Sequence, residues 1–360
     1  MKITLGIALA TILAVTVAYS DDVAELRTGG QASVDALHRE LMAKPADDRA
    51  SAEALLDRVC AQKDCRASRL YWYTDLDEAK RAAQRLRRPI LALHLLGRLD
   101  EELSCANSRF FRTLLYSDPS IANILRDDYV LYWHSVRPVP RVTIEMGDGR
   151  VIRQTITGNS VHYLLSEGGA VLDALPGLYS PKAFREQLER WVAFHGSFDR
   201  DPTTLRAYHQ TQATFQLVAA DPREFSIENA AVLAATKVVV EAPVLQKLAP
   251  SMKVRIEPMQ PWVEIGEREM SQVVFAAESI ALIREKQPEA DIDALRRTVA
   301  IDTAFNERDL HPKIHWWFAN GEVRDLDSLN ERVYRELFLT PSDDPWLGLR
   351  QPSVFAAIGD

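Results

Sequence analysis

Residues 88–108 read RPILALHLLGRLDEELSCANS, and this stretch decides the expected fold. Its apolar part, residues 90–96, is a continuous run of strand length between Pro89 and Gly97. Such runs are typical of strands that are buried on both faces of a sheet. A short acidic connection follows, and Cys105 then begins a helical pattern. The stretch therefore predicts a central buried strand that leads to a cysteine at the start of a helix.

The flanking sequence alternates between helical and strand patterns. A helical pattern over 75–86 precedes the buried strand, and helical patterns up to residue 125 follow it. A second strand is expected over 129–136, and a strand, a helix and a strand at this spacing form a parallel crossover unit. Two hairpins with glycine-containing turns and a last helix are then expected: 142–144 with 151–156, 161–165 with 170–175, and 181–194.

Beyond residue 198 the pattern is almost wholly helical. Apolar residues recur at helical spacing in four stretches: 205–219, 227–248, 267–286 and 292–317. We therefore expect an α/β domain over 71–198, with a central mixed sheet flanked by helices. A helical N-terminal segment over 21–70 precedes it, and an α-helical C-terminal domain over 199–360 follows it.

The composition narrows the classes of function. The chain has 360 residues, of which 47% are hydrophobic and 26% charged, and its formal net charge is −8. This is the composition of a globular protein, with too much apolar content for wholesale disorder. Because nucleic-acid binding needs clustered positive charge to displace counterions, the acidic balance argues against a nucleic-acid partner.

The first twenty residues have the layout of a secretory signal peptide. Lys2 precedes an apolar run over 3–18, and small residues, Ala18 and Ser20, flank Tyr19 at the expected cleavage site. The alternative is an uncleaved anchor helix, but the run is short for a span of about 20 residues. We expect residues 1–20 to be removed, and the remaining chain to be periplasmic or secreted without stable membrane insertion.

Residues 71–191 contain several motifs that together resemble those of a known protein family. They are Asp75-Leu-Asp-Glu-Ala79, the strand after Arg88, Cys105-Ala-Asn-Ser108, and residues 164–171 with 176–184. In this order they resemble the thioredoxin-like superfamily. Residues 97–112, with the tail motifs His315-Trp-Trp-Phe and Asp344-Pro-Trp-Leu-Gly-Leu, look like a group of exported bacterial thioredoxin-domain proteins that have no assigned activity.

The resemblance implies a site around one thiol. Cys105 stands at the position of the family's first active cysteine, but the second position is Ser108, so the motif is CxxS. The family's cis-proline, which lies beside that cysteine, corresponds to Asn159, Ser160 and Val161, which the resemblance makes substrate-binding residues. It implies no cofactor, and it implies exported protein thiols or disulfides as partners.

The reactivity of Cys105 depends on opposing charges. A helix N-terminus favours a thiolate, Ser108 can donate a hydrogen bond to it, and Arg109 adds positive charge. The acidic residues Asp100, Glu101 and Glu102 favour the neutral thiol instead. A reactive thiol and a buried, unreactive cysteine both stay open.

The other two cysteines lie close together in the sequence. Cys60 and Cys65 form a CxxxxC pattern, which can close a small disulfide loop in an oxidising compartment. A redox pair is the rival interpretation, but it lacks the CxxC spacing. We expect a structural disulfide.

Three functions follow from these patterns. The first is a monothiol oxidoreductase-like protein in which Cys105 is the nucleophile and Ser108 its hydrogen-bond donor. The second is a non-catalytic module whose Cys105 loop and helical domain bind another exported protein. A weaker third is a metal-binding protein that uses Glu307, His311 and His315, which recur every four residues around Pro312. The favoured interpretation of these three is a polar helix face, so we expect no metal.

Overall fold

The computed structural model describes residues 23–155, 158–198, 201–219 and 260–344. The expected signal peptide, the expected helix over 227–248 and the tail from residue 345 lie outside these ranges. The described strands are β1 Trp72–Tyr73, β2 Ile90–Leu96, β3 Val130–Arg137, β4 Arg141–Glu145, β5 Val151–Thr155, β6 Ser160–Leu165 and β7 Val171–Pro176.

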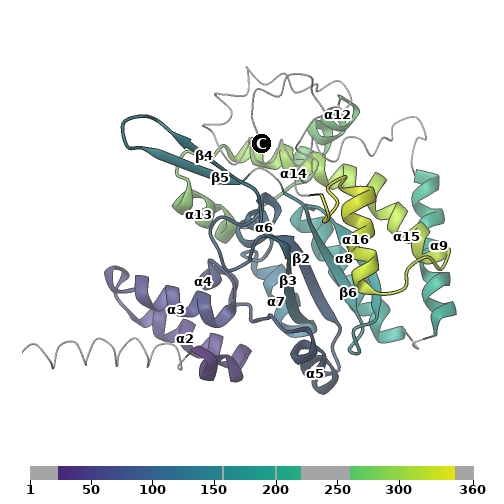
Figure 1. Ribbon diagram of the computed structural model, residues 1–360, viewed down its shortest axis with the longest axis horizontal. Coiled ribbons are helices and arrows are strands. Elements are labelled where there is room, and N and C mark those ends of the chain that lie inside the picture. Colours follow the sequence, from purple (N-terminus) through teal and green to yellow (C-terminus); the bar gives the residue numbers. More distant parts are fainter. Residues whose placement is uncertain (1–22, 156–157, 199–200, 220–259, 345–360) are drawn as a thin grey trace, which may run out of the picture.

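The described helical elements surround these strands (Figure 1). The helical elements before β3 are α2 Gln31–Ala43, η1 Ala46–Asp48, α3 Ala50–Cys60, α4 Cys65–Ser68, α5 Leu76–Leu86, α6 Ala106–Phe110, η2 Phe111–Leu115 and α7 Pro119–Asp128. Those that follow the sheet are α8 Pro181–Ser197, α9 Pro202–Ala219, α12 Gln260–Glu269, η6 Met270–Gln272, α13 Ala277–Lys286, α14 Ile292–Phe305, η7 Asn306–Leu310, α15 His311–Ala319, α16 Leu326–Arg332 and η8 Val333–Leu337.

The main sheet is mixed and has the strand order β1-β3-β2-β6-β7. β3 is parallel to β1 and β2, whereas β6 is antiparallel to both β2 and β7. With helices on both faces, this arrangement is roughly thioredoxin-like. β4 and β5 form a separate two-stranded sheet that projects from the body (Figure 1). The expected mixed α/β sheet and helical C-terminal region are confirmed at this level.

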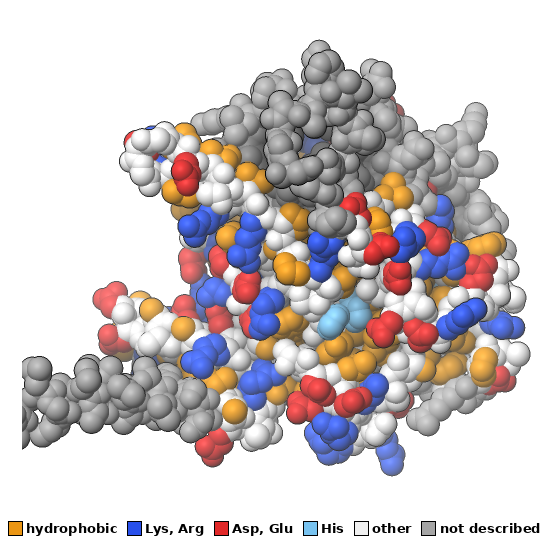
Figure 2. Space-filling model, in the orientation of Figure 1, with side chains coloured by type: hydrophobic (Ala, Val, Ile, Leu, Met, Phe, Trp, Pro, Cys, Tyr) orange, Lys and Arg blue, Asp and Glu red, His pale blue; other side chains and the backbone are white. Residues whose placement is uncertain are grey.

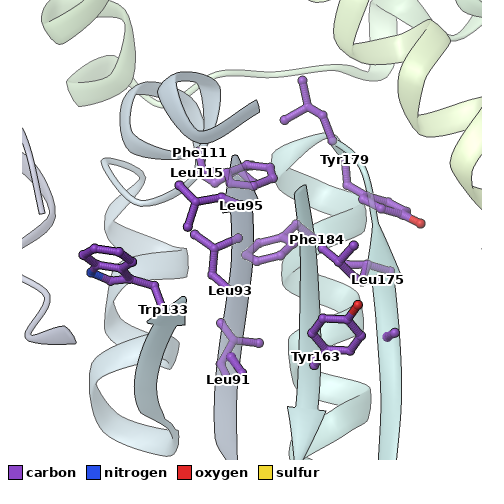
Figure 3. Close-up of a cluster of buried hydrophobic side chains, with 14 of the residues drawn as sticks. Leu91, Leu93, Leu95, Phe111, Leu115, Trp133, Tyr163, Leu175, Tyr179 and Phe184 are labelled. Atoms are coloured by element: carbon purple, nitrogen blue, oxygen red, sulfur yellow. The ribbon is translucent and has the colours of Figure 1, made fainter. Parts of the chain in front are cut away.

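β2 is the central strand because its residues are apolar on both sides. Each of its seven residues is buried, and Ile90 pairs with Val130 of β3 and with Leu165 of β6. Leu91, Leu93 and Leu95 lie on the face that packs toward helices (Figure 3). The prediction of a strand over 90–96, buried on both faces, is confirmed.

The opposite face of β2 and β6 is covered by α16. Asn330 of α16 accepts a hydrogen bond from the Tyr163 hydroxyl at 3.0 Å and lies 3.1 Å from His94 Nδ1. His94 on β2 and Tyr163 on β6 therefore point to the same side, and their rings are 5.1 Å apart. In Figure 1, α16 passes in front of the sheet while α7 and α8 lie behind it. The sheet is consequently buried on both faces.

One hydrophobic core extends from the sheet into the C-terminal helices. The turn between β7 and α8 shows how close the two parts are. Gly177 adopts a φ of +81°, and a Cβ at this position would lie 2.4 Å from the Asn306 side chain. Leu178 N donates to Asp302 Oδ2 at 3.0 Å, and Ser180 N donates to Thr303 Oγ1 at 2.8 Å. Side chains of α14 thus complete the hydrogen bonding of this turn.

The N-terminal helices form a second, smaller core. It is built from α2, α3 and α4, with Val34, Leu56 and Val59 fully buried. The Arg27 guanidinium joins it to the sheet by donating to Val59 O at 2.7 Å and to Trp72 O at 2.9 Å. This part of the chain lies beside the β1 edge of the main sheet (Figure 1).

The C-terminal helices differ from the expectation in one place. The predicted helix over 267–286 is two elements, because η6 ends at Gln272 and α13 begins at Ala277. Val274 lies in the break and is 69% exposed, although it falls inside the stretch 267–286 that was predicted to be one helix. None of the described helices is long and apolar enough to span a membrane.

Candidate functional site

Cys105 lies at the start of a helix, next to the end of the central strand. It is the N-cap residue of α6, and its backbone amide donates to Leu96 O of β2 at 3.2 Å. The side chain is 0% exposed and belongs to the main core. The cysteine therefore has the expected place in the chain, but its sulfur is not accessible to solvent.

The hydrogen-bond partner of the Cys105 sulfur is Ser160. Cys105 Sγ lies 3.0 Å from Ser160 Oγ and 3.8 Å from Asn159 O. The Ser108 hydroxyl instead lies 2.8 Å from the Cys105 carbonyl oxygen and 2.6 Å from Ser104 Oγ. In this structure the hydroxyl that is hydrogen-bonded to the sulfur therefore comes from β6, not from Ser108.

The start of β6 passes directly over α6. Gly158 permits this approach, because a Cβ at this position would lie 3.1 Å from Ala106 Cβ. Asn159, Ser160 and Val161 follow, and all three are buried. The residues that the resemblance assigned to substrate binding are therefore brought to the cysteine, but in a closed environment.

The C-terminal part of the chain closes this environment. The Tyr334 hydroxyl of η8 donates to Asn159 O at 3.2 Å, and Asn159 Nδ2 donates to Thr340 Oγ1 at 2.8 Å. Tyr334 is itself fully buried, and Thr340 is 5% exposed. We call η8 with the residues up to Thr340 the C-terminal cover. It hydrogen-bonds both the backbone carbonyl and the side-chain amide of Asn159.

The acidic connection before Cys105 is neutralised by nearby cations. Asp100 pairs with Arg98 at 2.6 Å, Glu101 with Arg141 at 2.8 Å, and Glu102 with Lys286 at 2.9 Å. Since each carboxylate has a cationic partner, the three acidic charges act less on the thiol than their number suggests. These pairs tie the loop to the β4–β5 hairpin and to α13.

A pocket of about 390 Å³ opens beside the same loop. The Cys105 loop and α6, the β5 strand, and the C-terminal helices all contribute to its lining. Among its charged lining residues, four are cationic, Arg109, Arg112, Arg153 and Lys286, and one is acidic, Glu102. Figure 2 shows Lys and Arg side chains gathered below the hairpin, with acidic ones between them. The pocket is thus basic in an otherwise acidic protein.

The other two cysteines are bonded to each other. The disulfide joins Cys60, the last residue of α3, to Cys65, the first of α4, with Cα atoms 6.3 Å apart. Both lie in the small N-terminal core, whereas Cys105 lies in the main core. The disulfide therefore staples the N-terminal helices, as the spacing predicted.

A second cluster of polar residues lies where the edge strand β7 meets α9 and α15. Asp173 on β7, His209 on α9, and His311 with His315 on α15 are each at most 4% exposed. His209 Nδ1 lies 2.8 Å from His315 Nδ1, and Asp173 Oδ1 lies 3.4 Å from His311 Nε2. Within the described ranges, Asp173, His209 and His315 are the group whose spacing could hold a metal ion.

Only half of this cluster was predicted from the sequence. The structure brings together His311 and His315, two of the three residues weighed there as metal ligands, whereas the third, Glu307 on η7, is exposed. Pro312 does not separate the two histidines, because it lies in the first turn of α15 and a π-helical turn precedes it. Asp173 and His209 were missed. An aspartate inside the apolar strand run of β7 was the one available signal.

Burial sets the protonation of this cluster. Desolvation lowers the pKa of His209 and lowers that of His315 well below its usual value, so both imidazoles are neutral at pH 7. Burial alone would raise the pKa of Asp173, but His315 and His311 outweigh it and hold that pKa below its usual range. The cluster therefore combines the neutral imidazoles of His209 and His315 with the carboxylate of Asp173.

Comparison with known proteins adds no assignment. The chain matches no protein-family model, and no curated protein matches it. Function must therefore be argued from the two sites themselves.

Proposed function

We propose that this protein is a non-catalytic member of the thioredoxin-like superfamily that binds another exported protein. The strand order of the main sheet and the place of Cys105 after β2 support the superfamily assignment. The single observation that carries the non-catalytic role is the burial of Cys105, whose sulfur is hydrogen-bonded to Ser160 beneath the C-terminal cover. A thiol must reach its target disulfide to attack it.

The binding surface in this proposal is the basic pocket. Its lining comes from the Cys105 loop, the hairpin and the C-terminal helices, so the pocket depends on the presence of all three. Arg109 and Arg153 line it and give it positive charge in a chain whose net charge is −8. Charge complementarity then favours an acidic segment of the partner protein.

Alkylation of the native chain tests the non-catalytic role. Cys105 is expected to react with iodoacetamide only through transient opening, on the order of a thousand-fold more slowly than an exposed thiol. The exposed reference is Ser120→Cys in a Cys105→Ser background, since Ser120 lies exposed on α7. Mass mapping after different times gives both rates. If native Cys105 reacts as fast as the reference, the monothiol oxidoreductase interpretation is correct instead.

Site-specific photo-crosslinking tests the binding surface in cells that produce the protein. A photoreactive residue replaces Arg153 in the pocket, and in the matched control it replaces Arg81, which is exposed on α5. We expect an adduct of one defined mass from position 153 and none from position 81. The same adducts from both positions, or none from either, would contradict the proposal. Cell fractionation and N-terminal sequencing of the same material test export and cleavage after Ser20.

A further inference from the structure

Three imidazoles and one carboxylate converge where β7 meets α9 and α15. One ligand atom from each of Asp173, His209 and His315 lies within 4.8 Å of the other two. The nearest pair, the two histidine nitrogens, is 2.8 Å apart, and Asp173 Oδ1 lies 3.9 Å from His315 Nδ1. His311 Nε2 adds a fourth atom, 3.4 Å from the same carboxylate oxygen. These four side chains are the histidine cluster.

The spacing matches that of a tetrahedral zinc site. With Zn–N and Zn–O bonds of about 2.0–2.1 Å, neighbouring ligand atoms of a tetrahedron are about 3.3 Å apart. Three of the separations in the histidine cluster lie on both sides of this value, at 2.8, 3.4 and 3.9 Å, and the ligand atoms of Asp173, His209 and His315 all lie within 4.8 Å of one another. Small shifts of Asp173, His209 and His315 would therefore bring three donors to an ion, and His311, which lies outside that three-residue group, would move toward them to supply the fourth.

Hydrogen bonds from neighbouring groups orient the side chains of His209 and Asp173, as metal ligands in proteins are usually oriented. The other nitrogen of His209, Nε2, lies 2.8 Å from Leu172 O, and as the donor there it leaves the lone pair of Nδ1 directed into the cluster. Asp173 Oδ2 accepts a hydrogen bond from Trp191 Nε1 at 2.8 Å, and Oδ1 accepts one from Ala174 N at 2.8 Å. Such hydrogen bonds to backbone and side-chain groups typically orient metal-bound histidines and carboxylates.

We propose that Asp173, His209, His311 and His315 form a structural Zn²⁺ site that fastens α9 and α15 to β7. Three imidazoles and one carboxylate are a ligand set that suits zinc. All four ligands are buried, so the coordination is closed to solvent, as in structural rather than catalytic sites. The site is independent of the basic pocket and of Cys105, and it requires neither to be functional.

The local sequence places His311 and His315 for this role. The two residues are four apart in α15, so their side chains lie one turn apart on the same face, with ring centroids 4.1 Å apart. The π-helical turn η7 precedes Pro312, whose ring a regular helix interior would not accommodate. Turns of this kind occur frequently at functional sites.

Metal content of the purified full chain tests the site. The protein is unfolded in chelator and refolded with either Zn²⁺ or EDTA, and bound metal is measured after gel filtration. We expect about one zinc per chain, and a higher midpoint of thermal unfolding in zinc than in EDTA. His315→Gln and Asp173→Asn should abolish zinc retention. His195→Gln, which alters a histidine paired with Glu167 outside the cluster, should retain it.

Cobalt spectroscopy keeps the test decisive if the ligand variants do not fold. Co²⁺ added during refolding of the unmodified chain should give the intense visible absorption of a tetrahedral N/O site, and equimolar Zn²⁺ should displace it. Folded protein that retains neither metal, with the same unfolding midpoint in zinc and in EDTA, would show that the cluster is only a hydrogen-bonded network and would overturn the proposal.

Discussion

At the scale of single residues, the buried His162 on β6 makes the stability of the folded chain depend on pH. Its Nε2 lies 2.7 Å from the Tyr116 hydroxyl, while Nδ1 has no hydrogen-bond partner among the described residues. The ring lies among aromatic side chains, 4.5 Å from Phe111 and 4.9 Å from Phe184 between centroids. This burial lowers its pKa from 6.5 to about 3. The folded chain therefore holds His162 neutral where an unfolded chain would protonate it.

His162→Phe should make the protein less sensitive to acid. Between pH 6.5 and 3 the unfolded state binds a proton at residue 162 that the folded state does not, so stability falls as pH falls, by about 1.4 kcal/mol per pH unit. From pH 7 to pH 5 the unmodified protein should lose about 2 kcal/mol more than His162→Phe. Urea unfolding at both pH values measures the difference. Equal losses would mean that His162 is protonated in the folded protein.

The sequence predicted the geometry of the thiol site only for residues that lie close to Cys105 along the chain. The sequence indicates Cys105 at a helix start because a strand and a helical pattern flank it directly. Ser108 is one turn away in the same helix, and a serine hydroxyl at that spacing readily bonds a carbonyl of the preceding turn, here that of Cys105. Ser160 is 55 residues away and reaches the sulfur only through strand pairing. No spacing rule relates the two residues.

At the scale of elements, strands were predicted more reliably than helix ends. Apolar runs and glycine turns mark β2 and the β6–β7 hairpin, because a buried strand needs apolar residues throughout. The break between η6 and α13 was missed, since apolar residues at helical spacing continue through it. The C-terminal cover was not foreseen either, because nothing in residues 333–340 shows which part of the sheet they contact.

The C-terminal cover should control access to Cys105. Tyr334→Phe removes the hydrogen bond to Asn159 O but keeps the ring, which should weaken the cover by about 1 kcal/mol. Native alkylation of Cys105 should then be about five-fold faster, because the open state is more populated. Tyr73→Phe, on the β1 edge strand, is the matched control and should leave the rate unchanged. An unaltered rate in Tyr334→Phe would show that the thiol is reached by another route.

At the scale of the whole molecule, the main core does not stop at the expected boundary near residue 199. Core residues of the sheet continue into those of α14 and α15. Asp302 and Thr303 also accept hydrogen bonds from the backbone of the β7–α8 turn. Composition and charge runs mark where a linker could lie, but they do not report whether the segments on either side share a core. That information lies in contacts between residues more than a hundred positions apart.

The sheet region is therefore expected not to fold without the C-terminal helices. A chain ending at residue 198 would leave the amides of Leu178 and Ser180 without Asp302 and Thr303, at a cost of about 1–3 kcal/mol for each buried group. It would also expose the core surface that α14 and α15 cover. Near-ultraviolet circular dichroism of residues 21–198 should show no fixed aromatic packing, in contrast to the full chain. A cooperative thermal transition of the fragment would contradict this expectation.

Asp173 has a further consequence for how the sheet assembles. It lies opposite Leu164 in the pairing of β6 and β7, with its carboxylate directed to Trp191 and the histidines. A slip of one residue between these strands would turn the carboxylate to the opposite face. There it would be buried without these partners, which costs about 3–5 kcal/mol. A single charged residue in an apolar strand thus disfavours the one-residue slip, because the slipped alignment would bury its carboxylate without these partners.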